Sequence, residues 1–261
     1  MIYILGGKFN AAIEAAKVLK QMKIPLYVYV SKGEEKIKGL HSLREYALQE
    51  GIEVIQNVNI FKGKKIFFLS VECDTILKMD EFKEGSRFFN LHFSLLPKYR
   101  GTMTSFWPII FREKETGVTL HEMDASIDTG PIIAQKAFPL REEYTCKDLY
   151  FKYHEVAAEL LRGILPRVVR EEYTSVPQIE IAASSFPRFL YNYFPKEFLS
   201  RDLKLMEKQD VYNILRALIF EEFQLPIVDG KKIKKVSLVS FDGFDFKIPT
   251  NNDYLYAKTI D

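Results

Sequence analysis

Apolar residues in the first 92 positions form five short runs, separated by segments in which apolar residues recur every three to four positions. The runs cover 2–5, 25–30, 52–55, 65–70 and 88–92, and the clearest helical segments cover 11–19 and 42–49. Strands that alternate with helices are typical of an α/β protein with a largely parallel sheet. We therefore predict a Rossmann-like, twisted sheet with flanking helices.

The pattern changes in the second half of the chain. One long helix is expected over about 146–169, and after residues 171–172 the strand–helix alternation ends. Beyond it we expect an extended segment, an aromatic run, a helix and a hairpin that turns at Asp242-Gly243, over residues 179–185, 186–195, 209–223 and 234–248. This predicts a larger domain over 1–178 and a small α+β C-terminal helix-and-hairpin domain over 179–261.

Charge, apolar stretches and cysteine content argue against a nucleic-acid-binding, membrane-spanning or disulfide-rich protein. The chain has 37 Lys+Arg against 35 Asp+Glu, so it offers no strong basic field for nucleic acid or an anionic membrane. Its start lacks the pattern of a signal peptide, and no apolar stretch approaches the roughly 18 residues of a membrane span. The two cysteines, Cys73 and Cys146, predict neither a disulfide framework nor a metal site. We expect a cytoplasmic protein with no metal.

The segment Asn90-Leu-His-Phe-Ser-Leu-Leu-Pro-Lys-Tyr-Arg-Gly101 carries the first candidate chemistry. Side chains two apart in a strand share a face, so Asn90 and His92 point the same way. They lie at the carboxyl end of an expected central strand, where α/β proteins bind ligands. Taken alone, the pattern also fits a strand end with satisfied polar side chains.

A second segment, 117–131, supplies a carboxylate. Residues 117–124 are expected to form a strand and 125–131 a tight loop, in which Asp128 precedes Thr-Gly. A glycine turn can present Asp128 to a cleft, although an Asp here is also a common turn former. On the same strand, the sequence favours His121 as a packing histidine over a second catalytic base.

Together the two segments resemble the folate-dependent formyltransferases. The matching pieces are Asn-x-His, Ser-Leu-Leu-Pro-x-Tyr-Arg-Gly and Gly-Val-Thr-x-His-x-Met-Asp-x-x-x-Asp-Thr-Gly, and they span about residues 88–135. This superfamily includes glycinamide ribonucleotide transformylase, methionyl-tRNA formyltransferase and the sugar-nucleotide N-formyltransferases. The resemblance implies that residues 1–178 form the catalytic domain and that Asn90, His92 and Asp128 are its Asn-His-Asp set.

The implied reaction needs these residue types. An amine attacks the formyl carbon of the cosubstrate N10-formyltetrahydrofolate, and negative charge develops on the formyl oxygen. The Asn90 amide and a protonated His92 would stabilise that oxyanion, and Asp128 would orient the imidazole and favour its charged form. This chemistry requires no metal.

The resemblance also implies where the folate binds. The pteridine of the family lies against backbone groups of the loop after the fourth strand and of the loop before the catalytic Asp. The corresponding residues here are Ser70, Val71, Glu72 and Asp124. Glu72 and Asp124 are equally well interpreted as solvated carboxylates.

The tail distinguishes among the subfamilies. Glycinamide ribonucleotide transformylases stop near the end of the first domain, and methionyl-tRNA formyltransferases carry a longer, basic C-terminal domain. The segments 183–188 and 210–217 instead resemble the sugar-nucleotide enzymes, although Phe223-Gln-Leu-Pro-Ile227 departs from their pattern. We therefore expect a formyltransferase that acts on the amino group of a nucleoside-diphosphate amino-deoxyhexose, with dTDP favoured, in lipopolysaccharide O-antigen or surface glycan synthesis.

Lys98, Tyr99 and Arg100 are the candidate contacts to this nucleotide-linked amino sugar, although a loop Lys and Arg are as often solvated. The nucleotide and the position of the amine, C3 or C4, stay open, and a homodimer is compatible with the sequence. The alternative functions are the tRNA and ribonucleotide formyltransferases already named, or an inactive family member that acts as a binding protein.

Overall fold

The structure is a computed structural model that describes residues 1–30, 36–199, 202–240, 242–251 and 253–260, without the side chains of 196–199. Its residues group into two compact units whose segments alternate along the chain. Unit 1 comprises Met1–Arg100, Gly117–Ala137 and Tyr153–Ala183, and unit 2 comprises Gly101–Thr116, Phe138–Lys152 and Ser184–Asp261. The predicted domain boundary near residue 178 stays a prediction.

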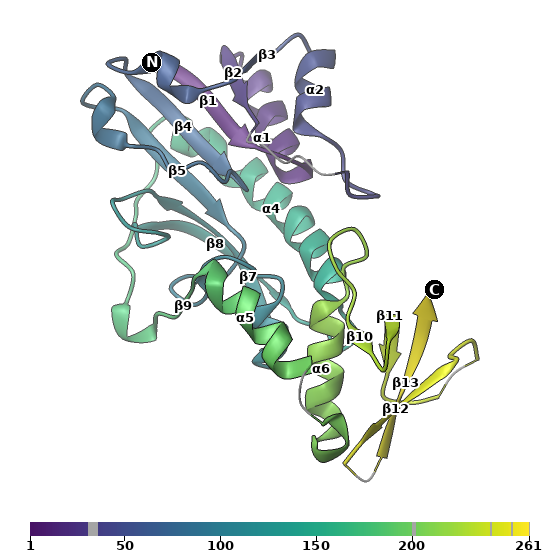
Figure 1. Ribbon diagram of the computed structural model, residues 1–261. Helices are drawn as coiled ribbons and strands as arrows, with labels where there is room; N and C mark the ends of the chain where they lie inside the picture. Colours follow the sequence, from purple (N-terminus) through teal and green to yellow (C-terminus); the bar gives the residue numbers. More distant parts are fainter. Residues whose placement is uncertain (31–35, 200–201, 241, 252, 261) are drawn as a thin grey trace. The chain divides into compact units, whose positions relative to one another are not determined.

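A seven-stranded sheet has the strand order β3-β2-β1-β4-β5-β7-β8 (Figure 1). Its strands are β1 (Ile2–Gly7), β2 (Leu26–Tyr29), β3 (Glu53–Ile55), β4 (Ile66–Val71), β5 (Arg87–His92), β7 (Glu115–Glu122) and β8 (Ile132–Pro139). The pairs from β3 to β5 are parallel, whereas β7 runs antiparallel to β5. This confirms the predicted α/β fold with a largely parallel sheet.

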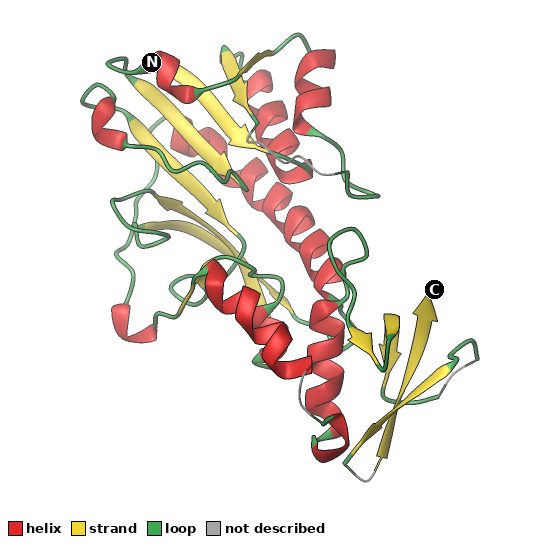
Figure 2. Cartoon of the chain, in the orientation of Figure 1, coloured by secondary structure: helices red, strands yellow, loops and turns green. Residues whose placement is uncertain are grey.

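Helices alternate with these strands along the chain (Figure 2). They are α1 (Asn10–Gln21), α2 (Leu43–Gln49), α4 (Cys146–Val169) and the short 3₁₀ helices η1 (Val58–Phe61), η2 (Met79–Glu81) and η3 (Glu180–Ala182). A Cβ added to Gly7 would lie 2.6 Å from Ala12 Cβ and 2.7 Å from the Val71 carbonyl oxygen. Only glycine therefore lets α1 pack this closely against the end of β1. None of the described helices is both long and apolar enough to cross a bilayer.

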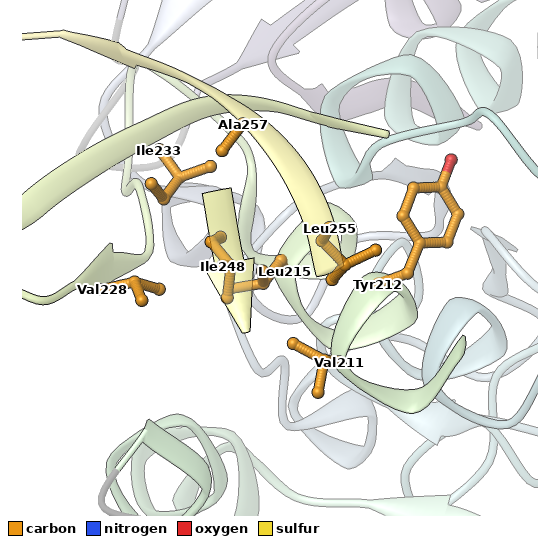
Figure 3. Packing of buried hydrophobic residues seen from close by; sticks show 8 residues of the cluster. All are labelled: Val211, Tyr212, Leu215, Val228, Ile233, Ile248, Leu255 and Ala257. Atoms are coloured by element: carbon orange, nitrogen blue, oxygen red, sulfur yellow. The ribbon is translucent and has the colours of Figure 1, made fainter. Parts of the chain in front are cut away.

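Unit 2 contains a four-stranded sheet of order β10-β11-β13-β12, antiparallel at each pair. Its strands are β10 (Ile227–Val228), β11 (Lys231–Ser237), β12 (Phe246–Thr250) and β13 (Asp253–Ile260), and α6 (Lys208–Leu218) lies beside them. Buried residues of α6 and the sheet form one core (Figure 3), made of Val211, Tyr212, Leu215, Val228, Ile233, Ile248, Leu255 and Ala257. The remaining elements of this unit are α3 (Trp107–Ile110), β9 (Ser185–Phe186), α5 (Arg188–Leu199) and η4 (Leu203–Leu205), and β9 pairs with β6 (Arg100–Gly101).

Two local predictions in the tail were wrong. The segments around 234 and 248 are not hairpin partners, because β13 lies between β11 and β12. Ala257 of β13 pairs with Val236 on one side and Phe246 on the other, so the last strand takes the central place. The helix expected to reach residue 223 ends at Leu218, and Phe220 then forms a bridge with Gln224. The predicted class, a small α+β region after the α/β sheet, is confirmed.

Candidate active site

Strand β5 presents Asn90 and His92 at its carboxyl end, as the two-residue period predicts. In register, Asn90 stands between Ser70 of β4 and His121 of β7. The antiparallel pairing of β5 with β7 therefore places a second histidine directly opposite Asn90. The candidate site is built where the parallel part of the sheet meets this antiparallel strand.

The loop after β7 folds back and places Asp128 beside β5. Asp128 has φ = 56°, a left-handed conformation that Asp adopts more readily than most residues. A Cβ at Gly130 would lie 1.8 Å from the Glu122 carbonyl oxygen, so the chain can return here only through glycine. The Glu122 N–H donates to the Pro131 carbonyl at 2.9 Å and closes the base of the loop.

The carboxylate of Asp128 joins the other two predicted catalytic residues. Asn90 Nδ2 donates to Asp128 Oδ1 at 3.0 Å, and Asp128 Oδ2 lies 3.5 Å from His92 Nδ1. The side chains of His92 and Asp128 are only 8% and 10% exposed. The structure thus brings Asn90, His92 and Asp128 together around one carboxylate.

His121 is a neighbour of this group that the sequence interpretation did not place there. Its Nδ1–H donates to the Glu122 carbonyl at 2.7 Å, which leaves Nε2 as an acceptor for the Asn90 amide at 3.2 Å. Both partners of Asn90 Nδ2, this imidazole nitrogen and the Asp128 carboxylate, are acceptors, so the orientation of the amide is defined. His121 and Asn90 are 31 positions apart, and only the strand pairing brings them together.

The loop after β5 holds the other side of His92. His92 Nε2–H donates to the Tyr99 carbonyl at 2.8 Å, and Tyr99 has φ = 61°. In this tautomer Nδ1 is the nitrogen that faces Asp128, so a proton on Nδ1 completes an N–H···O bond to the carboxylate. The arrangement suits a histidine that gains and loses a proton while its ring stays fixed.

The three predicted substrate contacts differ in exposure. Lys98 is exposed, whereas Tyr99 and Arg100 are buried. The guanidinium of Arg100 donates to the side chains of Gln178 and Glu180, and Glu180 raises the pKa of Arg100. Arg100 is therefore occupied by residues of its own chain.

The predicted folate loop begins where β4 ends. Ser70 and Val71 are buried, and Glu72 follows with φ = 59°. Glu72 Oε2 lies 3.1 Å from Nε2 of His154 on α4, so this carboxylate is turned toward the interior. The Ala11 N–H donates to His154 Nδ1 at 3.3 Å, and burial lowers the pKa of His154 to about 3 although the Glu72 carboxylate favours the charged ring.

Asp124, the fourth predicted folate contact, is exposed at the start of the loop that carries Asp128. Its Oδ1 accepts hydrogen bonds from Ser126 N at 3.0 Å and from Thr129 Oγ1 at 2.6 Å. Asp124 therefore braces the loop that carries Asp128. Across the described ranges, no group of three or more His, Cys, Asp or Glu side chains is placed to hold a metal ion.

Comparisons with known proteins agree with the fold and match the chain to formyl transferases. A family model described as formyl transferase matches residues 48–165, the stretch that contains Asn90, His92 and Asp128. The crystal structure of an N-formyltransferase from Helicobacter canadensis, in complex with folinic acid and dTDP-3-aminofucose, is 31% identical with a TM-score of 0.86, and the match covers 100% of both chains. The structure of WlaRD, a sugar 3N-formyl transferase with dTDP and 5-N-formyl-THF, is 30% identical with a TM-score of 0.84 and covers 100% of this chain and 98% of that one.

A curated relative, the bifunctional polymyxin resistance protein ArnA of Wigglesworthia glossinidia brevipalpis, is 33% identical over 191 residues. The match covers 68% of this chain, which spans 28% of the length of that relative. With identities of 30% and 31% over the full length of two solved members, the chain belongs to the formyl transferase family.

Proposed function

We propose that this protein is an N-formyltransferase that moves a formyl group from N10-formyltetrahydrofolate to the amino group of a dTDP-linked amino-deoxyhexose. The observation that carries the proposal is the Asp128 carboxylate, which contacts Asn90 Nδ2 at 3.0 Å and lies 3.5 Å from His92 Nδ1. In a chain of this family, that group supplies both a proton carrier and donors for a developing oxyanion.

In the reaction, the lone pair of the sugar amine forms a C–N bond to the formyl carbon, and the bond from that carbon to folate N10 then breaks. Nδ1 of His92, the ring nitrogen that faces Asp128, takes a proton from the attacking nitrogen, and His92 returns this proton to N10 as N10 leaves. The Tyr99 carbonyl at 2.8 Å and the Asp128 carboxylate at 3.5 Å keep the ring of His92 in place during these transfers. No step uses a metal.

Asn90 must exchange one hydrogen bond to serve as an oxyanion donor. Both N–H groups of its amide are used, one by Asp128 at 3.0 Å and one by His121 at 3.2 Å. The bond to the charged carboxylate is the stronger of the two. The formyl oxygen therefore takes the place of His121 as the acceptor when the charge develops.

We propose that the folate lies against the main chain of the loops that contain Ser70, Val71, Glu72 and Asp124. Two of the carboxylates are engaged within the chain, Glu72 near His154 and Asp124 by Ser126 and Thr129, which supports a main-chain role. Catalysis belongs to the proposed domain over residues 1–178.

The acceptor carries its amine on C3 of the hexose. Two solved relatives, at 30% and 31% identity, are described with this chemistry, one as a sugar 3N-formyl transferase and one in complex with dTDP-3-aminofucose. Exposed Lys98 is the proposed contact to the diphosphate. The N-formylated sugar nucleotide is used in surface glycan synthesis, and the reaction takes place in the cytoplasm. We propose that the active species is a homodimer that has no nucleic-acid or membrane partner.

The proposal is tested by a panel of acceptors offered with N10-formyltetrahydrofolate. The panel contains dTDP-3-amino and dTDP-4-amino hexoses, their UDP and GDP counterparts, glycinamide ribonucleotide and methionyl-tRNA. We expect the highest kcat/KM with a dTDP-3-amino hexose. A higher value with methionyl-tRNA or glycinamide ribonucleotide than with every sugar nucleotide would replace the proposed substrate class.

A further inference from the structure

We propose that Gln178 is a positioning residue that sets the distance between Asp128 and His92. The inference rests on the proposed function, because it assigns a role in the same reaction. Gln178 lies outside the segment that the family model matches, residues 48–165, and outside the motifs that resemble the family.

The amide of Gln178 holds the catalytic loop by its main chain. Its Nε2 donates to the Asp128 carbonyl and to the Gly130 carbonyl, both at 2.8 Å. Next to it, Ile132 and Val176 exchange two backbone hydrogen bonds of 2.8 Å, which fix the segment that carries Gln178. Asp128 thus has its backbone held at a left-handed φ while its carboxylate reaches Asn90.

The oxygen of the same amide holds the loop that contains Tyr99, whose carbonyl accepts a hydrogen bond from His92. Gln178 Oε1 accepts from Arg100 Nε at 3.1 Å and from Arg100 Nη2 at 2.8 Å. Arg100 follows Tyr99, whose carbonyl accepts the hydrogen bond from His92 at 2.8 Å. One side chain therefore connects the Asp128 loop to the loop that fixes the His92 ring.

The contacts of Gln178 also fix the orientation of its amide and occupy all of its hydrogen-bonding groups. Two carbonyl oxygens face its NH₂ group and a guanidinium faces its oxygen, so an inverted amide would oppose like groups at every contact. Both of its N–H groups and both acceptor positions are taken. No smaller residue reproduces this set, and glutamate would set a carboxylate against two carbonyl oxygens.

The consequence for catalysis follows from geometry. Displacing a reacting or supporting group by about 1 Å can cost on the order of 100-fold in rate. Losing Gln178 frees the Asp128 backbone and the Arg100 loop at the same time, so the separation of 3.5 Å between Asp128 and His92 is no longer imposed. Because the separation between Asp128 and His92 acts on the proton transfer, most of the loss should fall on kcat.

Glu180 offers a matched control. It pairs with the same guanidinium, at 2.7 Å from Arg100 Nη2, and its side chain is 71% exposed. Glu180→Gln removes the charge of this partner and leaves every bond of Gln178 in place. Its kcat should stay within threefold of wild type.

The test measures kcat, both KM values and the thermal midpoint of wild type, Gln178→Ala, Gln178→Glu and Glu180→Gln, and of Gln178→Ala in an Asp128→Asn background. We expect Gln178→Ala to lose on the order of 10-fold to 100-fold in kcat with KM values within threefold, and Gln178→Glu to lose more. In the Asp128→Asn background the same change should cost less than threefold, because Gln178 acts through Asp128. An equal loss in both backgrounds, or an unchanged kcat, overturns the inference.

Amide hydrogen exchange gives a readout that does not depend on turnover. The peptide 122–132 should exchange faster in Gln178→Ala than in wild type and Glu180→Gln, whereas exchange in β1 and β4 stays unchanged. Unchanged exchange in 122–132 refutes the role of Gln178 even if no acceptor is turned over. A wild type that transfers no formyl group refutes the proposed function instead, so the two failures are distinguishable.

Discussion

Asn90 of β5 and His121 of β7 stand opposite each other, and the amide of Asn90 donates to His121 Nε2 at 3.2 Å. His121 Nδ1–H donates to the Glu122 carbonyl at 2.7 Å, so in the neutral ring Nε2, the nitrogen that faces Asn90, is the acceptor. The orientation of the Asn90 amide is therefore set by a histidine across the strand pair. This relationship explains why a second histidine belongs to the site although it is 2% exposed.

Replacing His121 with alanine should lower kcat by about fivefold to tenfold, because the Asn90 amide is no longer held in the orientation in which it meets the formyl oxygen. The Asn90 amide then keeps only its bond to Asp128 and can rotate. His41→Ala, at an exposed position, is the control and should match wild type. Equal kcat values for the His121 variant and the control would show that His121 only packs.

Asp128→Asn should preserve the fold and the affinity for folate but lower kcat by about 10-fold to 100-fold. The amide keeps the shape of the side chain but loses a charged hydrogen bond of roughly 1.5–3 kcal/mol and the charge that faces His92. Steady-state kinetics and a folate binding titration measure the two effects separately. A rate within threefold of wild type would reduce Asp128 to a turn former.

Two glycines should respond to alanine in opposite directions. Gly130→Ala places a Cβ 1.8 Å from the Glu122 carbonyl oxygen and should lower the free energy of unfolding by at least about 2 kcal/mol. Gly163 lies on the exposed side of α4 with nothing within 4 Å of an added Cβ, so Gly163→Ala should raise it by about 0.5–1 kcal/mol. Urea unfolding of both variants checks the pair, and a tolerated Gly130→Ala would contradict the loop geometry.

Acid should destabilise the protein through His154. Burial lowers the pKa of His154 from 6.5 to about 3, so between these values the unfolded chain binds a proton that the folded chain does not. The contribution is fully present above pH 6.5 and is lost as the pH falls toward 3, with a slope of up to about 1.4 kcal/mol per pH unit. His154→Gln keeps an acceptor for the Ala11 N–H without titrating, so its unfolding free energy should fall less steeply below pH 6.5, and equal slopes would reject the assignment.

The sequence predicted that strand 88–92 and the loop 125–131 contribute to one site because the signals for both are local. The two-residue period aligned Asn90 with His92, and Asp128-Thr-Gly identified the return loop. The contacts of His121 and Gln178 depend on strand pairing and on a segment 50 positions away from Asp128, so no local pattern carries them. The partners of Arg100, Gln178 and Glu180, are equally remote in the sequence, so no local pattern shows that its guanidinium is paired.

In the tail, too, local sequence signals did not predict which strands pair. The turn at Asp242-Gly243 is a valid local signal, but it does not decide which strands pair. Leu255 and Ala257 of β13 are both fully buried, so the last strand takes the central position between β11 and β12. Burial of the final strand, rather than turn chemistry, set the order of the sheet.

The central claim is tested most directly by following a ¹³C-labelled formyl group from N10-formyltetrahydrofolate to a dTDP-3-amino hexose by mass spectrometry. Wild type should transfer one label to the amine for each tetrahydrofolate released, and Asn90→Ala and His92→Ala should each be slower by about 10²–10³-fold with the fold intact. Transfer by either variant within threefold of wild type would contradict the role of that residue. Release of tetrahydrofolate without labelled sugar would contradict the account as a whole.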